Sequence, residues 1–492
     1  MMQDSGDNAL EERLLADQEQ DHQECEDQQE QTLGENAATN AEAPPSVAGQ
    51  AVLLFAFTVN YIFGAGVLGI PYAVAHGGII AASVTLVISS ALGLLSMVWV
   101  LECQERANCF KGTTGIVEFS TMCELFIGRK TRTLYEVSLT LFVLSSAWMY
   151  ASIFSVSLAK SVPIMSDSSQ CDLASVKGFL WNVPHKSCWG DYLIYLGIFA
   201  LLMSILVQTD LAKMKVLQLT FTCVGLFALF LMVITVGAAM PEDGFADIDT
   251  SLEVFNASSF GAVFGTFVFA QLCHHGVPLL SHIPERRDIV RPVFVAVIGT
   301  TTSLYLVLGV MCAIFFGVVD DVPTPRPVNK LITLNWADYT AGAASAGPFA
   351  QAVSYYVRLY PAITCGAAFP LYAITLGNGW YHSYYGGETP PPGVGFSRRI
   401  FYLAATFPAI FCAAFMADVS FMLILVGISA FIIAFFIPPS MQLQSRRIVP
   451  ECVVTRYSWH FSKPFYCYVC LIFACIAFCY TVISAVNPEV EV

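Results

Sequence analysis

Two long apolar runs of this sequence are interrupted by residues that could hold a polar ligand. The first run, from about 48 to 75, contains Gly64, Gly66, Gly69 and Pro71. Three glycines and a proline within eight residues make a poor continuous helix. Hydrocarbon offers no partner to a freed backbone N–H or C=O, so such a break requires cover from other protein or a polar ligand.

The second interruption lies in the sixth apolar run, where polar residues, a glycine and a proline extend from Gln271 to Pro278. Broken segments at matching places in two halves of a chain are the main sequence indication of a secondary transporter built from inverted repeats. We therefore expect spans one to five and six to ten to form the two halves, with an eleventh span appended.

The two breaks offer complementary backbone charges. N–H groups at the start of a half-helix carry partial positive charge and favour a carboxylate. Freed carbonyls of the other break accept hydrogen bonds from an ammonium group. The predicted substrate contacts are Gly64, Ala65, Gly66, Gln271, Leu272 and Cys273. Together they recognise a zwitterion without a net charge in the protein, which predicts an amino acid or a similar small substrate.

A coupling ion has two candidate sites. Asn60 has an amide oxygen suited to a cation, with Thr364 opposite it, although each residue alone is more typical of an ordinary interhelical hydrogen bond. Alternatively, His274 and His275 carry a proton, because histidine titrates near neutral pH. The plainer interpretation of both histidines is that they hydrogen-bond the broken helix.

Arg358 and Tyr360 stand inside the eighth apolar run. A charge at that depth costs about 2.5 kcal/mol or more, which indicates a gate or a cavity contact unless Arg358 extends to the interface. An intramembrane enzyme would need paired catalytic groups at one depth, and only His274 and His275 meet that condition. We therefore predict no enzyme, no cofactor and no metal except sodium.

Composition sets the class of protein. The 492 residues are 56% hydrophobic and 12% charged, with a mean hydropathy of +0.64. Soluble domains carry about 25% charged residues. Repeated apolar runs predict an all-α polytopic membrane protein. Its eleven spans are expected near 49–75, 78–101, 133–160, 191–208, 212–239, 259–281, 292–318, 347–376, 400–417, 419–439 and 464–487.

Basic residues predict the orientation. With the N-terminus in the cytosol, the cytosolic loops carry 16 Lys and Arg residues and the opposite loops carry 5, as the positive-inside rule requires. Asn256 begins a glycosylation sequon on the opposite side. Cys171 and Cys188 lie there too, either as a disulfide or as two free thiols.

The chain divides into three expected parts. Residues 1–48 form an acidic cytosolic tail without apolar periodicity, which we interpret as disordered. Residues 49–487 form the membrane domain, and 488–492 a short non-cytosolic tail. The net charge of −14 gives no indication of a nucleic-acid partner. Glu11 to Leu15 resembles an acidic di-leucine signal for sorting adaptors, or is an incidental leucine pair. The membrane is either the plasma membrane or an endolysosomal one.

The first interruption, from Asn60 to Ala73, and the second, from Cys273 to Leu279, resemble helices one and six of the amino acid/auxin permease family. Thr333 to Trp336 and Val357 to Pro361 are similar to its transmembrane protein 104 branch. The resemblance covers roughly 49–487. It implies a LeuT-type fold, a five-plus-five inverted repeat plus one helix, and amino acid transport coupled to sodium or protons.

The resemblance also implies an ion site. In sodium-coupled members an Asn of helix one and a Thr of helix eight contact the ion, and these match Asn60 and Thr364. His275 replaces a proline of the better-studied branch, which leaves the choice of ion open. Two functions are consistent with the sequence: a secondary active transporter, or an amino-acid sensor that signals through its N-terminal tail.

Overall fold

The computed structural model describes residues 46–166, 180, 186–209, 215–243, 260–317, 327–340, 346–385 and 396–486. The chain divides into two compact units, residues 1–50 and 51–492. Of the first unit, only residues 46–50 lie in the described ranges. Cys171, Asn256, residues 1–45 and residues 488–492 lie outside those ranges, so the predictions made for them stay predictions.

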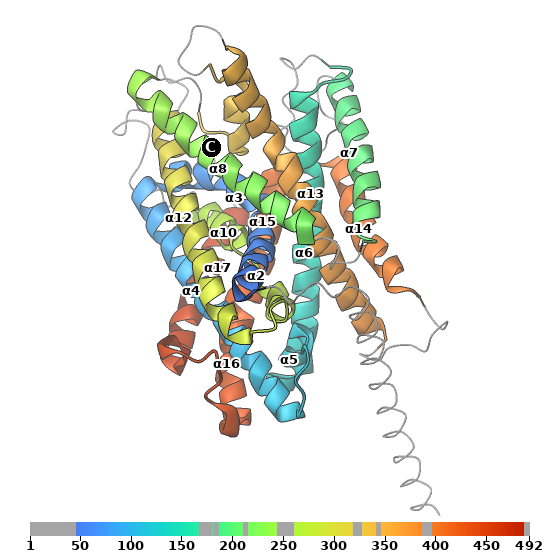
Figure 1. The fold of residues 1–492 in the computed structure, drawn as a ribbon, viewed down its shortest axis with the longest axis vertical. Helices are drawn as coiled ribbons and strands as arrows, with labels where there is room; N and C mark the ends of the chain where they lie inside the picture. Colours follow the sequence, from blue (N-terminus) through green and yellow to red (C-terminus); the bar gives the residue numbers. More distant parts are fainter. Residues whose placement is uncertain are drawn as a thin grey trace, which may run out of the picture. The chain divides into compact units, whose positions relative to one another are not determined.

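The described residues contain no strand, and helices account for every long element (Figure 1). Eight uninterrupted helices are long and apolar enough to cross a membrane: α4 (Ile79–Lys111), α6 (Arg129–Ser161), α7 (Lys186–Leu206), α8 (Lys215–Asp243), α12 (Val290–Phe316), α13 (Pro348–Tyr384), α14 (Arg398–Phe415) and α17 (Pro464–Val486).

Three further spans are composite. Each combines short helices: α2 (Val47–Ile62) with α3 (Gly66–Gly77), α10 (Phe260–Ala270) with η3 (His274–Gly276) and α11 (Val277–Leu280), and α15 (Val419–Phe431) with η6 (Ile432–Phe436) and α16 (Ile437–Ile448). The described residues thus give 10 spans, or 11 when the bent pair α2–α3 counts as one. The prediction of an all-α polytopic membrane protein is confirmed.

The tenth span changes helix type for a local reason. Its η6 segment is a π-helix placed directly before Pro438 and Pro439. Two consecutive prolines lack the N–H groups that would continue the α-helical ladder, so the preceding turn widens.

Burial separates central spans from peripheral ones. The most apolar window of the sixth span is 94% buried and that of α13 is 83% buried, whereas the windows of α14 and α17 are each 28% buried. In Figure 1, α7 and α14 lie side by side at one edge of the helices. The two breaks are therefore enclosed by protein, and α14 and α17 face the lipid.

Helix α4 ends ten residues later than predicted, because Glu102 and Arg106, just after the predicted end, are buried together. Arg106 donates from Nη2 to Glu102 at 2.6 Å, and neither side chain has any exposed area. Gly112 ends the helix with a φ of 68°, the left-handed conformation that glycine adopts readily.

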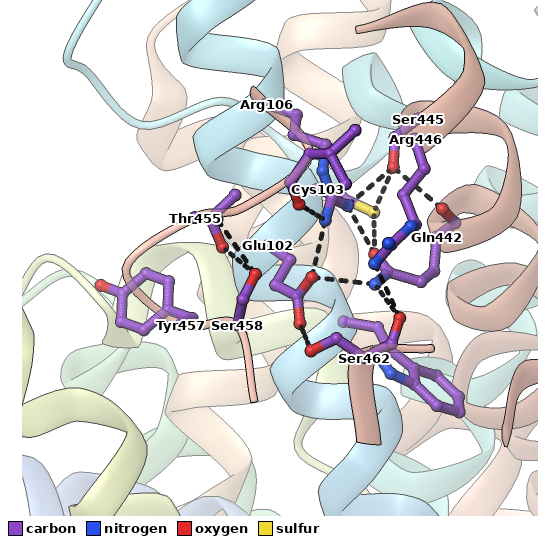
Figure 2. A network of polar contacts seen from close by, with 12 residues as sticks. Glu102, Cys103, Arg106, Gln442, Ser445, Arg446, Thr455, Tyr457, Ser458 and Ser462 are labelled. Atoms are coloured by element: carbon purple, nitrogen blue, oxygen red, sulfur yellow. Dashed lines mark hydrogen bonds and ion pairs between the residues drawn. The ribbon is translucent and has the colours of Figure 1, made fainter. Parts of the chain in front are cut away.

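A polar network surrounds this ion pair (Figure 2). Arg106 also donates to Gln442 and Ser445 of α16 and to the carbonyls of Cys452 and Val453. Glu102 accepts from Gln442 at 2.9 Å and from the hydroxyl of Ser462. We call this face, formed by the C-terminal ends of α4 and α16, the N-terminal end of α6 and residues 449–463, the basic face.

Candidate functional site at two broken helices

The first break separates α2 from α3. The two helix axes differ by 57°, and residues 63–65 join them. Gly64 donates its N–H to the carbonyl of Ile62 at 2.8 Å, so one predicted contact group is already used. Within the described residues, the N–H groups of Ala65 and Gly66 donate to no backbone carbonyl. These two groups remain at the positive end of α3.

The second break separates α10 from η3. Gln271 and Leu272 donate their N–H groups to the preceding turn, at 3.4 and 3.2 Å. Their own carbonyls accept no backbone hydrogen bond from the described residues. The carbonyl of Cys273, by contrast, accepts from Gly276 at 3.0 Å. Of the three predicted carbonyls, those of Gln271 and Leu272 are therefore open.

The two breaks meet. A Cβ added at Gly66 would lie 2.5 Å from the Cα of Ala270, the last residue of α10. One turn further, a Cβ at Gly69 would lie 3.3 Å from Thr266. Small residues thus allow the backbones of α3 and α10 to approach closely, as in other membrane helix pairs. The positive end of α3 and the open carbonyls after α10 lie next to each other.

Two tyrosines cap the carbonyls that the breaks release. Tyr372 donates to the carbonyl of Tyr61 at 3.1 Å, and Tyr305 donates to the carbonyl of Ala270 at 3.3 Å. Both tyrosines are buried. Neither tyrosine was predictable from the sequence, because one tyrosine within an apolar run is typical of ordinary packing. These two hydrogen bonds satisfy the carbonyls of Tyr61 and Ala270, while the N–H groups of Ala65 and Gly66 and the carbonyls of Gln271 and Leu272 stay open.

Tyr150 of α6 is a third tyrosine at the site, and it too was missed. A Cβ at Gly64 would overlap its hydroxyl. The hydroxyl is buried beside that of Tyr372, which donates to the Tyr61 carbonyl, and it makes no hydrogen bond of good geometry among the described residues. A buried unpaired hydroxyl is unfavourable by about 1–3 kcal/mol, so its presence at the break indicates a ligand group.

The adjacent histidines have different surroundings. His274 donates from Nε2 to the carbonyl of Gly93 at 3.0 Å and lies 2.5 Å from the hydroxyl of Ser96. His275 has no partner at either ring nitrogen among the described residues. Its ring packs among Tyr61, Phe142 and Tyr372, with centroids 5.3 to 5.6 Å away. His274 therefore anchors the break to α4, and His275 has nitrogens free for a ligand or a proton.

Asn60 and Thr364 are linked through a residue that sequence reasoning missed, Gln218 of α8. The amide nitrogen of Asn60 donates to the carbonyl and the side-chain oxygen of Gln218, each at 2.7 Å. Gln218 in turn donates to the carbonyl of Ala367, one turn after Thr364. Thr364 donates to carbonyls of its own helix. The one sequence signal that could have indicated Gln218 is its position as a polar residue in an apolar run.

The other predicted residues lie as follows. Tyr360 is buried, and its ring lies beside Gly225, which also faces Phe63 of the first break. Arg358 is half-buried, and its described contacts stay on its own helix, with its guanidinium 4.8 Å from the ring centre of Tyr355. The structure therefore brings Tyr360 near the first break, whereas Arg358 makes no contact there with the described residues.

Cys188 at the start of α7 is disulfide-bonded. Its predicted partner Cys171 lies outside the described residues, so the pairing itself stays a prediction. A disulfide that the sequence analysis did not predict joins Cys109 to Cys452, 343 residues apart.

We expect the capping tyrosines and Tyr150 to respond differently to loss of the hydroxyl. Tyr372→Phe leaves the Tyr61 carbonyl without a donor and should lower the free energy of unfolding by about 1–3 kcal/mol. Tyr150→Phe removes an unpaired hydroxyl and should leave that quantity unchanged or raised. Thermal unfolding of the purified variants without ligand measures both. Equal losses of stability in Tyr372→Phe and Tyr150→Phe would contradict the role of Tyr372 as the donor to the Tyr61 carbonyl.

The fold and the site define the class of this chain: a polytopic helical membrane protein whose first and sixth spans are broken where they touch. The chain belongs to the transmembrane amino acid transporter protein family, which it matches over residues 48–486. This confirms the family that the two interrupted motifs indicated.

Curated relatives agree with the predicted branch. The chain is 25% identical to transmembrane protein 104 of Mus musculus over 292 residues, 57% of this chain and 54% of the relative. It is 23% identical to the transmembrane protein 104 homolog of Caenorhabditis elegans over 354 residues, 66% and 67% of the two chains. The match to the mouse protein thus spans about half of that relative's length.

Proposed function

We propose that this chain is a secondary active transporter of amino acids that works by alternating access and couples transport to sodium or protons. The observation that carries the proposal is the contact of the two breaks, with Gly66 against Ala270. Membership of the amino acid transporter family supports it. The five-plus-five inverted repeat is part of the proposal, because it places interrupted helices at one depth.

The carboxylate of the substrate would bind at the first break. The N–H groups of Ala65 and Gly66 offer two donors at the start of α3, and the hydroxyl of Tyr150 offers a third. Charge-assisted hydrogen bonds of this kind are roughly twice as strong as neutral ones. Gly64 contributes by having no side chain where the ligand approaches Tyr150.

The ammonium group would bind at the second break. The carbonyls of Gln271 and Leu272 are open acceptors next to the first break. The side-chain oxygen of Gln271 is also buried without a partner among the described residues. The site thus neutralises both ends of a zwitterion with dipoles alone, which avoids burying a net protein charge.

Both candidate ion sites keep free lone pairs. Asn60 uses its amide hydrogens on Gln218, so its oxygen is available to sodium. Thr364 donates its hydrogen to its own helix and also retains an oxygen lone pair. Oxygen ligands beside an unwound helix suit sodium. Among the described residues, Nδ1 of His274 and both ring nitrogens of His275 have no partner, so each ring offers a nitrogen to the coupling proton.

We expect substitution of the two histidines to have different effects on stability and on uptake. His274→Phe loses the bond to Gly93 and should destabilise the protein by about 1 kcal/mol. His275→Phe removes two unpaired nitrogens, keeps the aromatic packing and should not destabilise it. If the coupling proton binds His275, His275→Phe abolishes uptake driven by a pH gradient. An unfolding temperature that falls equally in both variants would contradict the different roles of His274 and His275.

The proposed orientation has the N-terminus and the basic face in the cytosol, in the plasma membrane or an endolysosomal membrane. The excess of Lys and Arg on that side supports it. Sorting adaptors are proposed partners of Glu11 to Leu15 in the tail.

The test is uptake of labelled amino acids into proteoliposomes under an imposed sodium gradient or pH gradient. We expect at least one amino acid to accumulate against its gradient, and to lose accumulation when the ion gradient is collapsed. Ligand protection of the protein without any uptake would instead favour the amino-acid sensor. Absence of both would contradict the proposal.

A further inference from the structure

Disulfides occur at opposite faces of this protein. Cys109 is at the end of α4 on the basic face, bonded to Cys452 of the loop that follows α16. Cys188 stands three residues before Asp191, which accepts from the N–H groups of Ile164, Met165 and Ser166 just after α6. Helix α6 starts on the basic face and has 33 residues, which corresponds to about 50 Å.

One of these disulfides must therefore face the cytosol, whichever way the chain is inserted. The excess of basic residues places the Cys109–Cys452 pair there. Cytosolic thiols are kept reduced, and cytosolic disulfides are usually transient and either catalytic or redox-sensing. A permanent structural role fits Cys188 on the opposite face but not Cys109 and Cys452.

The pair is also accessible to small molecules. Cys109 is exposed, and Cys452 lines a cavity of about 630 Å³ on the basic face. The cavity wall carries two arginines, Arg287 and Arg456, and two carboxylates, Glu105 and Glu285, together with hydroxyl and amide side chains. Its volume is in the range of small-molecule sites.

We propose that Cys109 and Cys452 form a reversible redox site on the cytosolic face, reduced by a low-molecular-weight thiol that enters this cavity. The thiolate attacks Cys452 Sγ, the S–S bond breaks, and Cys109 leaves as a thiolate that takes up a proton. A second thiol attacks the mixed disulfide and releases Cys452 as a thiol and the reductant as its own disulfide. The reverse exchange with that small disulfide reforms the bond.

The reduced form stays folded, because noncovalent bonds join the same two segments. Arg106 donates to the carbonyls of Cys452 and Val453 at 3.2 and 3.0 Å. Arg456 also pairs with Glu105 of α4. The disulfide therefore restrains motion of residues 450–457 against α4 without deciding the fold.

The restrained segment lies next to the sixth span. Gln104 of α4 accepts from Ser281, directly after α11, and both line the cavity. The Cys109–Cys452 bond lies about one and a half turns after Gln104 on α4. It limits how far the C-terminal end of α4 can move away from residues 450–457. Oxidation thus reduces the opening of the cavity.

The test is differential alkylation of the full-length protein in cells, read by mass spectrometry. In resting cells, a membrane-permeant reagent should label most of Cys109 and Cys452, and a mild disulfide-forming oxidant should reduce that labelling at least fivefold. Removing the oxidant should restore the labelling within minutes. Cys188 serves as the internal control and should stay unlabelled throughout. This readout does not depend on a transported substrate, so its failure is distinct from failure of the proposed function.

Three results would overturn the redox site: labelling of both cysteines that does not change with oxidant, a bond that persists in resting cells, or labelling by a membrane-impermeant reagent applied outside. Variants extend the test. Cys109→Ser should leave Cys452 labelled under oxidant, whereas Cys475→Ser, which removes an exposed free thiol of α17, should behave as the unaltered protein. Hydrogen exchange of residues 450–457 should be slower in the oxidised protein than in the reduced one.

Discussion

Gly66→Ala is expected to destabilise the protein and to abolish ligand binding. The new Cβ would lie 2.5 Å from the Cα of Ala270, a backbone atom that cannot rotate away. Relief requires α3 and α10 to separate, which also separates the two breaks. Forced overpacking costs about 1–3 kcal/mol. The measurements are thermal unfolding and amino-acid protection of the purified variant.

Gly299→Ala provides the matched control for this prediction. Gly299 lies within α12, is exposed, and has no atom within 4 Å of an added Cβ. Alanine is a better helix former than glycine by about 1 kcal/mol, so this variant should be neutral or slightly stabilised. Equal behaviour of the two variants would contradict the close approach of α3 to α10.

Arg106→Ala is expected to cause the largest loss of stability on the basic face. The substitution leaves Glu102 buried with its charge unpaired, and removing one partner of a buried pair costs about 3–5 kcal/mol. It also removes a donor from the side-chain oxygen of Gln442 and from the carbonyls of Cys452 and Val453. Chemical or thermal unfolding in detergent measures the change.

Two comparisons make the network prediction specific. Arg132 pairs with Glu124 and Glu136 while partly exposed, so Arg132→Ala should cost at most about 1 kcal/mol. The double variant Glu102→Leu with Arg106→Met removes both charges and should be more stable than Arg106→Ala alone. A double variant as unstable as the single one would show that packing, not charge pairing, dominates at this position.

The sequence predicted the breaks because glycine and proline act locally. Gly64 and Gly66 disfavour a continuous helix, and the structure interrupts the helix at residues 63–65, whereas α3 continues through Gly69 and Pro71. The polar stretch after Ala270 predicted the second break in the same way. At both breaks, residues close in the sequence predicted where the helix is interrupted.

Pairings between distant residues were not predictable in this way. Tyr305, Tyr372 and Gln218 each stand alone in an apolar run, where no spacing indicates which carbonyl or amide they meet. The disulfide of Cys109 with Cys452 spans 343 residues and was missed for the same reason. The end of α4 was predicted ten residues early. Charged residues such as Glu102 and Arg106 are typical of a solvent-exposed end of a span, and the sequence does not show that these two pair with each other inside the protein.

The most direct test of the dipolar site uses three forms of the amino acid that gives the strongest protection: the zwitterion, its primary amide and its N-acetyl derivative. A ligand that binds only the folded protein raises the unfolding temperature according to its affinity. We predict that the zwitterion raises this temperature and that neither derivative does at the same concentration, because each lacks one of the two charged groups. Protection by the amide or the N-acetyl form equal to that of the zwitterion would contradict recognition by the two helix breaks.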